Sequence, residues 1–327
     1  MYASVNLLYK GQVYQCQPDE TVLDALLRQQ VPVPYSCKKQ TCLSCMMRSL
    51  NGTPPVLSQR NLKETLQLQN NFLACACYPD RDMEIALAQD IAETQITAKV
   101  IEKNRLSDQI IELVLECESP LEFYGGQSVL LLNYLHIGKK LSIASAGSTK
   151  SKDRIELHVE CLANNCFAKW VHEILMIDDE VFLGSVSGDM FYFSGQPNQA
   201  LLLVAWGSNL AAMIGLMQDA FENNHSGEIC LFHGVASKDQ LYLQAELNEI
   251  SDYFPNFHYI PCIEGDTALQ NVQHYSTDEI VAKMLPNLTG WKVFVCGNWV
   301  QTHNIQRYAY LAGADMKDIY LEVMSIY

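Results

Sequence analysis

The sequence lacks any uninterrupted apolar run of about 18 to 20 residues, the length that a membrane span needs. Its longest candidate, residues 200–206, is short and predicts a buried strand. Residues 1–6 lack the basic region and the long apolar stretch of a secretory signal. We therefore expect no membrane span and a cytoplasmic protein.

Basic residues are also scarce, since 22 Lys and Arg stand against 37 Asp and Glu and give a formal net charge of -15. A protein that neutralises nucleic-acid phosphates needs clustered Lys and Arg, so this balance argues against nucleic acid as a partner. Neither His-Glu-x-x-His nor Gly-x-Ser-x-Gly occurs, and the eight histidines are scattered. Hydrolase chemistry therefore has no support in the sequence.

The chain is too long for one ordinary core, because domains usually hold about 100 to 150 residues. Residues 1–92 carry about equal numbers of acidic and basic side chains, so the excess negative charge lies beyond them. We predict three domains, comprising residues 1–92, 93–196 and 197–327.

The first domain reads as a small α+β unit. Strand patterns over residues 5–9 and 12–16 flank a turn at Lys10-Gly11. An amphipathic helix follows, with its apolar residues at helical spacing before two prolines: Val22, Leu23, Leu26 and Leu27. A short strand is expected around residues 83–85.

The second and third domains differ in pattern. Five strand-length runs predict a β-barrel in the second: residues 96–101, 109–115, 128–133, 155–161 and 180–184. One helix, residues 167–176, should bury Phe167, Val171, Ile174 and Leu175. In the third domain, strands alternate with helices near residues 210–221, 241–249 and 300–311, with one long loop after residue 261. That alternation predicts a doubly wound parallel sheet.

Cysteine is abundant, with twelve residues, and four of them follow the C-x4-C-x2-C spacing with a distant fourth: Cys37, Cys42, Cys45 and Cys75. In a reducing compartment, thiols serve metals or packing. This spacing is typical of plant-type [2Fe-2S] clusters, where one tight loop offers three thiolates and another segment brings the fourth. We predict these four residues as the cluster ligands.

Alternatives to this assignment are few. Cys77 is the rival fourth ligand, because it would face the same way as Cys75 in an extended segment. Zinc would favour two C-x2-C pairs, and the chain has one. Simple packing of buried cysteines is the third possibility. No histidine lies two or three residues from a cysteine of the loop, which argues against a Rieske-type cluster.

The order of a cysteine-loop module, a barrel and a nucleotide-type α/β domain resembles the ferredoxin-NAD(P) reductase family, and within it the reductase components of bacterial oxygenases. The resemblance implies a ferredoxin-like β-grasp domain, an FAD-binding-type antiparallel β-barrel and an NAD(P)-binding-type α/β domain. It implies an electron-transfer enzyme that takes electrons from NADH or NADPH through FAD to the [2Fe-2S] cluster. The acceptor would be a protein such as an oxygenase.

The family's Arg-x-Tyr-Ser and x-Ala-Ser motifs fall on one segment, and the resemblance assigns FAD contacts to Lys139, Leu141, Ser142, Ala144 and Ser145. Lys139 keeps a cation for the pyrophosphate, Ser142 keeps a hydroxyl for the flavin ring, and Leu141 replaces the stacking aromatic residue. The family's Gly-x-x-Ser falls on residues 165–168, where Ala168 replaces the serine.

The nicotinamide motifs are also altered. The family's Gly-Gly-Thr-Gly falls on Trp206, Gly207, Ser208 and Asn209, so only one glycine remains. The resemblance assigns nucleotide contacts to Gly207, Ser208, Asn209 and Gly297, and a place over the flavin to the last residue, Tyr327. It implies that Ser142, Cys296 and Glu322 border the hydride path and act as catalytic residues.

Two other functions stay open at this point. The chain could be a [2Fe-2S] relay or docking protein whose flavin and nicotinamide sites are degenerate, as the changes at Leu141, Ala168, Trp206 and Asn209 suggest. It could also keep FAD but take electrons from a donor other than nicotinamide. The choice between NADH and NADPH is likewise open.

Overall fold

A computed structural model describes residues 4–87, 95–147, 153–161, 165–264 and 275–324. The chain divides into two compact units, Met1–Glu93 and Thr94–Tyr327. The predicted boundary between residues 92 and 93 lies outside the described residues. The predicted boundary between residues 196 and 197 lies in a loop of the second unit and stays a prediction.

The first unit is a five-stranded sheet in the order β2-β1-β5-β3-β4. Its strands are β1 (Val5–Tyr9), β2 (Gln12–Cys16), β3 (Met46–Ser49), β4 (Asn71–Leu73) and β5 (Met83–Ala86). β1 and β5 pair in parallel, and the other neighbours pair antiparallel. The sheet packs against α1 (Val22–Arg28), and α2 (Glu64–Leu68), η1 (Val56–Ser58) and η2 (Ala74–Ala76) complete the unit.

Local sequence explains the first elements. Lys10 and Gly11 both have positive φ, 49° and 74°, as a two-residue hairpin turn that matches strand twist requires. Thr21 caps α1, because its side chain accepts a hydrogen bond from the N–H of Asp24. Val22, Leu23 and Leu26 of α1 are fully or almost fully buried. The predicted hairpin and helix are therefore confirmed, whereas β3, β4 and α2 were not predicted.

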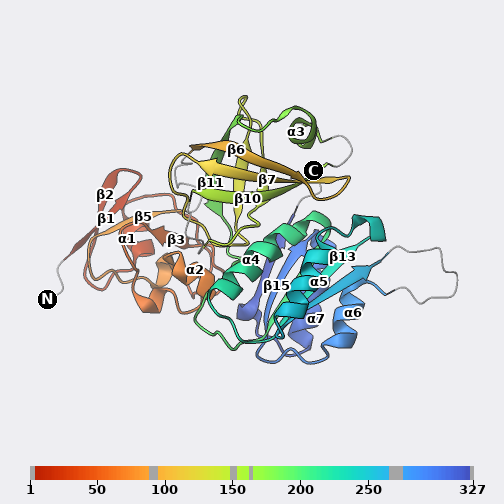
Figure 1. Cartoon of the computed structure of the whole chain (residues 1–327). Helices are drawn as coiled ribbons and strands as arrows, with labels where there is room; N and C mark the ends of the chain where they lie inside the picture. The colour runs from red at the N-terminus through yellow and green to blue at the C-terminus, as the bar shows by residue number, and fades with distance from the viewer. Residues whose placement is uncertain (1–3, 88–94, 148–152, 162–164, 265–274, 325–327) are drawn as a thin grey trace. The chain divides into compact units, whose positions relative to one another are not determined.

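The barrel of the second unit (Figure 1) contains β6, β7, β10 and β11, and its full strand order is β10-β7-β6-β11-β8-β9. Its strands are β6 (Ile96–Arg105), β7 (Ile110–Cys117), β8 (Ser128–Leu132), β9 (Gly138–Ser142), β10 (Arg154–Glu160) and β11 (Glu180–Ser187). All its paired strands are antiparallel. A bridge between Ile143 and Leu157 joins the two edges of the sheet and closes it. The predicted antiparallel barrel is confirmed.

The predicted helix of the barrel takes another form. It begins as α3 (Cys166–Lys169) and continues as a π-helix, η4 (Trp170–Ile174). Phe167, Val171 and Leu175 are buried as expected, but Ile174 is 64% exposed. The expectation for Ile174 was wrong, because the wider π turn rotates the residues that follow away from the positions of an α-helix.

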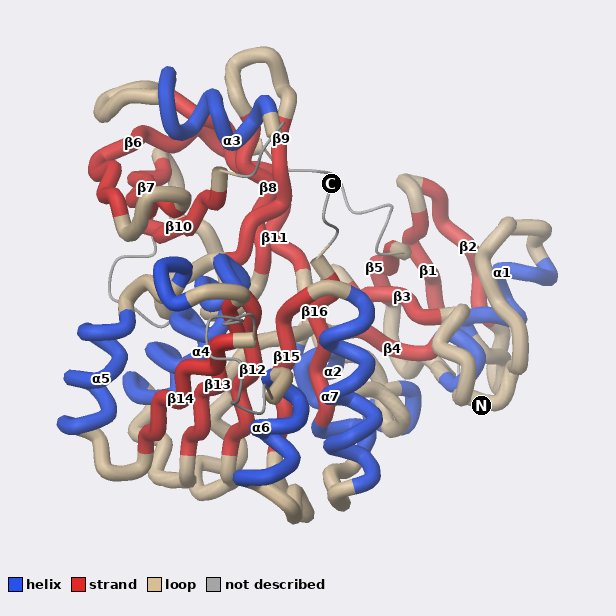
Figure 2. The backbone as a smooth tube through the Cα atoms, turned by 90° about the vertical axis from the view of Figure 1, so that its right-hand side faces the viewer, coloured by secondary structure: helices blue, strands red, loops and turns tan. Residues whose placement is uncertain are grey.

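The rest of the second unit is a five-stranded parallel sheet in the order β14-β13-β12-β15-β16. Its strands are β12 (Leu201–Trp206), β13 (Ile229–Val235), β14 (Phe257–Ile263), β15 (Lys292–Gly297) and β16 (Ile319–Val323). Apolar residues of α4 (Leu210–Glu222) and α5 (Gln244–Tyr253) pack on one face, and those of α6 (Thr277–Met284) and α7 (Trp299–Leu311) pack on the other (Figure 2). Short turns η5 (Gly207–Asn209), η6 (Lys238–Gln240) and η7 (Met316–Asp318) connect them.

This doubly wound sheet confirms the fold predicted for the third domain, with one correction. The stretch after residue 261 is not one long loop, because α6 forms there. The signal was present in the sequence: Ser276 and Glu279 form a capping box at the start of α6. Within the described ranges, every helix is too short or too polar to cross a bilayer.

Candidate functional site

The cysteine loop of the first unit turns sharply and directs hydrogen-bond donors at sulfur. Lys38, Gln40 and Leu43 have positive φ values of 50°, 62° and 57°. The N–H of Lys39 and the hydroxyl of Thr41 donate to the Sγ of Cys37 at 3.2 and 3.4 Å. The loop therefore stabilises negative charge on a sulfur atom.

These donors shift the acidity of two cysteines. The hydroxyl of Thr41, together with the backbone N–H of Lys39, lowers the pKa of Cys37 to about 5. The N–H of Cys37 donates to the Sγ of Cys42 at 3.4 Å and lowers the pKa of that thiol as well. Because the thiolate is the form that binds metal, both side chains are prepared as ligands.

Cys45 and Cys75 form a second neighbouring pair. Cys45 is buried, which raises its pKa to about 11, and its side chain interacts directly with Cys75. Cys75 lies in the turn η2 and is half-buried, whereas Cys77 is fully buried in the core. Burial raises the pKa of Cys77 to about 12.

The argument that Cys75 and Cys77 face the same way was wrong, because η2 is a 3-10 turn and not an extended strand. Burial favours Cys75 over Cys77 as the fourth ligand, and the assignment stays a prediction.

The four cysteines form two neighbouring pairs. A [2Fe-2S] cluster takes two protein ligands on each iron. The pairs Cys37 with Cys42 and Cys45 with Cys75 correspond to that division. The residues present therefore fit the cluster.

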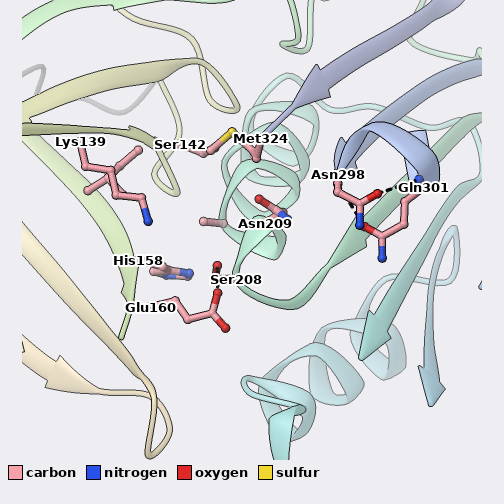
Figure 3. A pocket seen from close by; sticks show the side chains of 11 residues that line it. Lys139, Ser142, His158, Glu160, Ser208, Asn209, Asn298, Gln301 and Met324 are labelled. Carbon is pink, nitrogen blue, oxygen red and sulfur yellow. Dashed lines mark hydrogen bonds between the residues drawn. The ribbon is translucent and has the colours of Figure 1, made fainter. Parts of the chain in front are cut away.

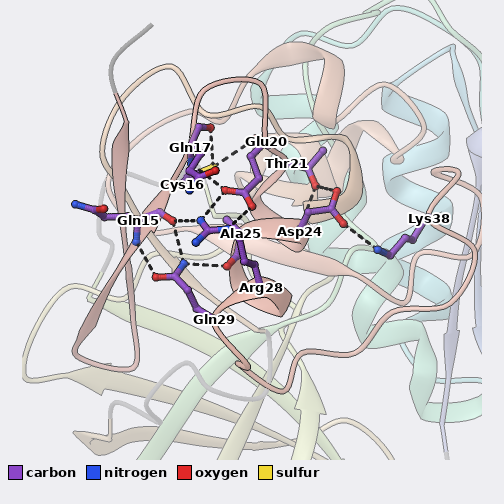
Figure 4. A network of polar contacts seen from close by, with 10 residues as sticks. All are labelled: Gln15, Cys16, Gln17, Glu20, Thr21, Asp24, Ala25, Arg28, Gln29 and Lys38. Carbon is purple, nitrogen blue, oxygen red and sulfur yellow. Dashed lines mark hydrogen bonds and ion pairs between the residues drawn. The ribbon is translucent and has the colours of Figure 1, made fainter.

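An ion pair connects the cysteine loop to α1 (Figure 4). The Nζ of Lys38 lies 2.8 Å from a carboxylate oxygen of Asp24, and the Thr21 hydroxyl donates to the other oxygen at 2.7 Å. These contacts lower the pKa of Asp24, with the Lys38 hydrogen bond as the largest cause. The charge of Lys38 is thus partly neutralised, while Lys39 beside it is exposed.

A cavity of about 190 Å³ lies between the barrel and the carboxyl ends of the parallel strands in the second unit (Figure 3). Strands β9 and β10 supply one wall, and η5, the starts of α4 and α7, and the residue after β16 supply the other. The lining residues are Lys139, Leu141, Ser142, His158, Glu160, Ser208, Asn209, Ala211, Asn298, Gln301 and Met324. Five of them were predicted from the sequence: Lys139, Leu141, Ser142, Ser208 and Asn209.

Ser142 carries a hydroxyl that a ligand could bind in this cavity. Its Oγ is buried and has no hydrogen-bond partner among the described residues. Leaving such a hydroxyl unpaired costs about 1–3 kcal/mol, so a polar group of a ligand is expected to satisfy it. The flavin ring carries such groups, and the Lys139 cation lies on the same strand. The residues of β9 therefore fit the ring end of FAD.

The barrel wall of the cavity also carries two residues that sequence reasoning missed, His158 and Glu160. Glu160 accepts a hydrogen bond from the Ser208 hydroxyl at 2.7 Å. The Nδ1 of His158 lies 3.1 Å from the Tyr242 hydroxyl, and its Nε2 lies 3.8 Å from a carboxylate oxygen of Glu112, whose pKa is lowered chiefly by the interaction with His158. His158 and Glu160 stand two apart on β10, so strand alternation places both on one side.

Several predicted site residues lie away from the cavity wall. Ser145 accepts a hydrogen bond from the N–H of Glu156 at 3.1 Å, and the neighbouring Ala144 is fully buried. Cys296 is also fully buried, and burial raises the pKa of its thiol. Their predicted roles toward FAD and the hydride path stay predictions.

Glu322 pairs with Lys140 at 3.0 Å and is not among the lining residues. Tyr327 lies outside the described residues.

In the segment that corresponds to the family's second FAD motif, a backbone N–H group already has a hydrogen-bond partner within the chain. Asn165 precedes α3, and its side chain accepts the N–H of Ala168 at 3.0 Å. In the family's pattern, the backbone N–H groups at this helix start would bind a phosphate of FAD. In this chain, the Asn165 side chain takes one of the amides that would otherwise point outward.

Comparison with known proteins identifies two domains in the chain. Residues 5–80 match the 2Fe-2S iron-sulfur cluster binding domain, and residues 203–303 match the oxidoreductase NAD-binding domain. The chain is 28% identical to the phenol hydroxylase P5 protein of Acinetobacter pittii over 88% of this chain and 84% of that protein. It is 27% identical to the phenol 2-monooxygenase reductase component DmpP of Pseudomonas sp., over 91% and 87%.

These matches confirm the predicted resemblance to the ferredoxin-NAD(P) reductase family. Solved structures share the fold of the chain along nearly its whole length. The cytochrome P450 reductase GcoB of Amycolatopsis superposes with a TM-score of 0.65 at 23% identity, covering 98% of each chain. The ferredoxin reductase of carbazole 1,9a-dioxygenase gives 0.64 at 20% identity with the same coverage. The order of domains predicted from the sequence is the order of this family.

Proposed function

We propose that this reductase takes electrons from NAD(P)H and passes them through FAD to a [2Fe-2S] cluster and on to a protein acceptor. The observation that carries the proposal is the Ser142 hydroxyl, which has no partner in the described part of the chain and lies in a cavity at the carboxyl ends of the NAD-binding sheet. The same chain carries a cysteine loop with donors aimed at its sulfur atoms.

Each site contributes a separate task. When bound, FAD accepts two electrons with a hydride and gives them up one at a time, as a one-electron cluster requires. Ser142 would donate to the flavin ring, and Lys139 would neutralise its phosphate charge. Cys37, Cys42, Cys45 and Cys75 would hold the irons. The protein thereby positions both cofactors.

The acceptor is an oxygenase component in this proposal. Relatives of the chain are named as the reductase components of phenol 2-monooxygenase and of terephthalate 1,2-dioxygenase. Lys39, exposed beside the cluster ligands in a chain of net charge -15, offers a local cation for such a partner. The eight cysteines outside the proposed cluster are free thiols, which suits a reducing compartment, so we place the protein in the cytoplasm.

A cofactor inventory with anaerobic titration tests the proposal. We expect the purified protein to contain two irons and one FAD per chain and to bleach when NADH or NADPH is added. Protein that holds iron but releases no flavin on denaturation, and does not bleach with either nucleotide, would exclude a reductase.

A second function, a [2Fe-2S] relay or docking protein, is favoured by one observation in particular. Asn165 caps the helix start at which the family binds FAD phosphate. The same inventory separates the two, because the relay would accept one electron per chain from a chemical reductant and none from NADH or NADPH.

A further inference from the structure

The indole of Trp206 lies across the carboxyl ends of three neighbouring strands. Trp206 ends β12 and is the register partner of Gly234 on β13. A Cβ atom at Gly234 would lie 2.5 Å from Cδ1 of the indole, and one at Gly297, the end of β15, would lie 2.8 Å from Cε3. Both positions must therefore be glycine while the ring stays where it is.

A carboxylate holds the indole in this position. The Nε1–H of Trp206 donates to Oε1 of Glu264 at 2.9 Å. The same oxygen accepts the N–H and the hydroxyl of Thr277 at 2.9 and 2.6 Å. In this position Trp206 is only 7% exposed. The ring is thus fixed by one hydrogen bond and by packing on two glycines.

The place that the indole fills is the one where a ligand is expected. From β12 the chain proceeds to β13 on one side, and β15 lies on the other, so the order of the strands reverses between β12 and β15. In open parallel sheets, ligands bind outside the carboxyl ends of the strands at this reversal. Residues 203–303, which contain it, match the NAD-binding domain. The indole therefore occupies space that a dinucleotide needs.

We propose that the indole of Trp206 competes with the nicotinamide nucleotide for this crevice. NAD(P)H binds there only after the indole leaves Gly234 and Gly297 and releases Glu264. The inference rests on the proposed function, since it takes NAD(P)H as the electron donor. Its consequence is a reduced apparent affinity, because only the fraction of molecules with the indole displaced can bind.

Isothermal titration calorimetry of the full chain with NADH, and separately with NADPH, tests this inference. We expect Trp206→Gly to bind the better nucleotide at least about 10-fold more tightly than the wild type, because it removes both the ring and its hydrogen bond. Trp206→Phe keeps a ring but loses the N–H, so we expect a gain of about 3-fold. Trp291→Phe, which changes a tryptophan at the opposite end of β15, is the matched control and should bind like the wild type.

Affinities of Trp206→Gly that are within about twofold of the wild type, or weaker, would overturn the inference, as would the absence of binding in every variant. If Trp206→Gly loses its thermal unfolding transition, Trp206→Phe decides alone, and an unchanged or lower affinity refutes the proposal. Reduction of the cofactors is a separate readout. Tighter binding without any bleaching would keep this inference and remove the proposed function, whereas bleaching with equal affinities would do the reverse.

Discussion

The cysteine loop and the carboxyl ends of the parallel strands prepare for ligands in opposite ways. In the loop, donors point at the sulfur of Cys37, and the backbone takes positive φ at three residues to place them. At the strand ends, the indole of Trp206 fills the space, and Glu264 holds it. The cysteine loop therefore presents thiolates that a cluster would bind, whereas the space at the strand ends is already filled by a side chain of the protein. Family motifs alone do not separate these two conditions.

The sharpest test of this comparison uses the two cysteines that follow β4. Cys75→Ser should remove the visible absorbance of the cluster completely, because three thiolates leave one iron short of a ligand. Cys77→Ser should keep the absorbance and lower the free energy of unfolding by about 1–3 kcal/mol, because it buries a hydroxyl in an apolar core. The measurements are iron content, absorbance and urea unfolding. The assignment fails if the cluster survives in Cys75→Ser and disappears in Cys77→Ser.

The choice between these cysteines marks the limit of what spacing can predict. The spacing of Cys37, Cys42 and Cys45 depends on the loop itself and was readable from the sequence. The direction of Cys75 depends on the turn η2, which no local pattern indicated. The helical spacing of apolar side chains likewise predicted α1 well. It failed at Ile174, where a π-helix changes the period.

The cavity shows the same limit at longer range. Ser142 and Lys139 were found through one continuous motif on β9, whereas His158 and Glu160 belong to β10 and carry no motif of their own. The effect of Trp206 requires Gly234, Gly297 and Glu264, which lie on three other segments and meet only when the sheet forms. Neighbouring residues determine a helix or a turn, so these can be predicted from a short segment. The position of a side chain that fills a crevice depends on contacts between residues that are distant in sequence.

A second test concerns a buried histidine under the strand ends. The Nε2–H of His233 donates to the carbonyl of Gly207 at 3.1 Å, so in the neutral ring Nδ1 accepts from the Tyr259 hydroxyl at 3.2 Å. Burial lowers the pKa of His233 to about 4. The unfolded chain takes up this proton near pH 6.5. The free energy of unfolding should therefore fall by about 3 kcal/mol as the pH drops from about 6.5 to about 4.

Tryptophan fluorescence during urea unfolding measures this loss in the second unit, because all four tryptophans lie beyond residue 94. His233→Gln should be less stable at pH 7 and should have a flatter pH profile. His258→Gln, which changes a half-exposed side chain on β14, serves as the control and should keep the wild-type profile. A profile of His233→Gln as steep as that of the wild type would assign the pH dependence to other groups.

A third test asks whether the unpaired hydroxyl in the cavity serves the flavin. Ser142→Ala should slow the reduction of the flavin by NADH or NADPH about 10-fold, the rate equivalent of one hydrogen bond of about 1.4 kcal/mol. Stopped-flow absorbance measures the rate. Ser185→Ala is the matched control, since the Ser185 hydroxyl on β11 is also buried without a partner among the described residues but does not line the cavity. Equal rates in both variants would mean that Ser142 is an ordinary buried serine.

The smallest expected effect concerns Glu322, for which the family resemblance implies a catalytic role. Its carboxylate lies 3.0 Å from the Nζ of Lys140, and the Ser128 hydroxyl donates to the same oxygen at 3.4 Å. The pair therefore joins the parallel sheet to the barrel within the second unit. Lys140 is 46% exposed, so solvent screens the pair, and we expect a coupling energy of only about 0.5 kcal/mol.

A double-mutant cycle of Lys140→Met and Glu322→Gln, followed by urea unfolding at low and high salt, measures this coupling. The control cycle uses Lys99 and Asp178, a more exposed pair at 2.7 Å within the barrel, where we expect about 0.2 kcal/mol. If the coupling energy between Lys140 and Glu322 is zero and Glu322→Gln slows flavin reduction, Glu322 belongs to the hydride path. If the coupling energy weakens with salt and Glu322→Gln reduces the flavin at the wild-type rate, Glu322 serves to hold the two walls of the cavity together. Of the three predicted catalytic residues, Ser142 would then be the one that lines the cavity.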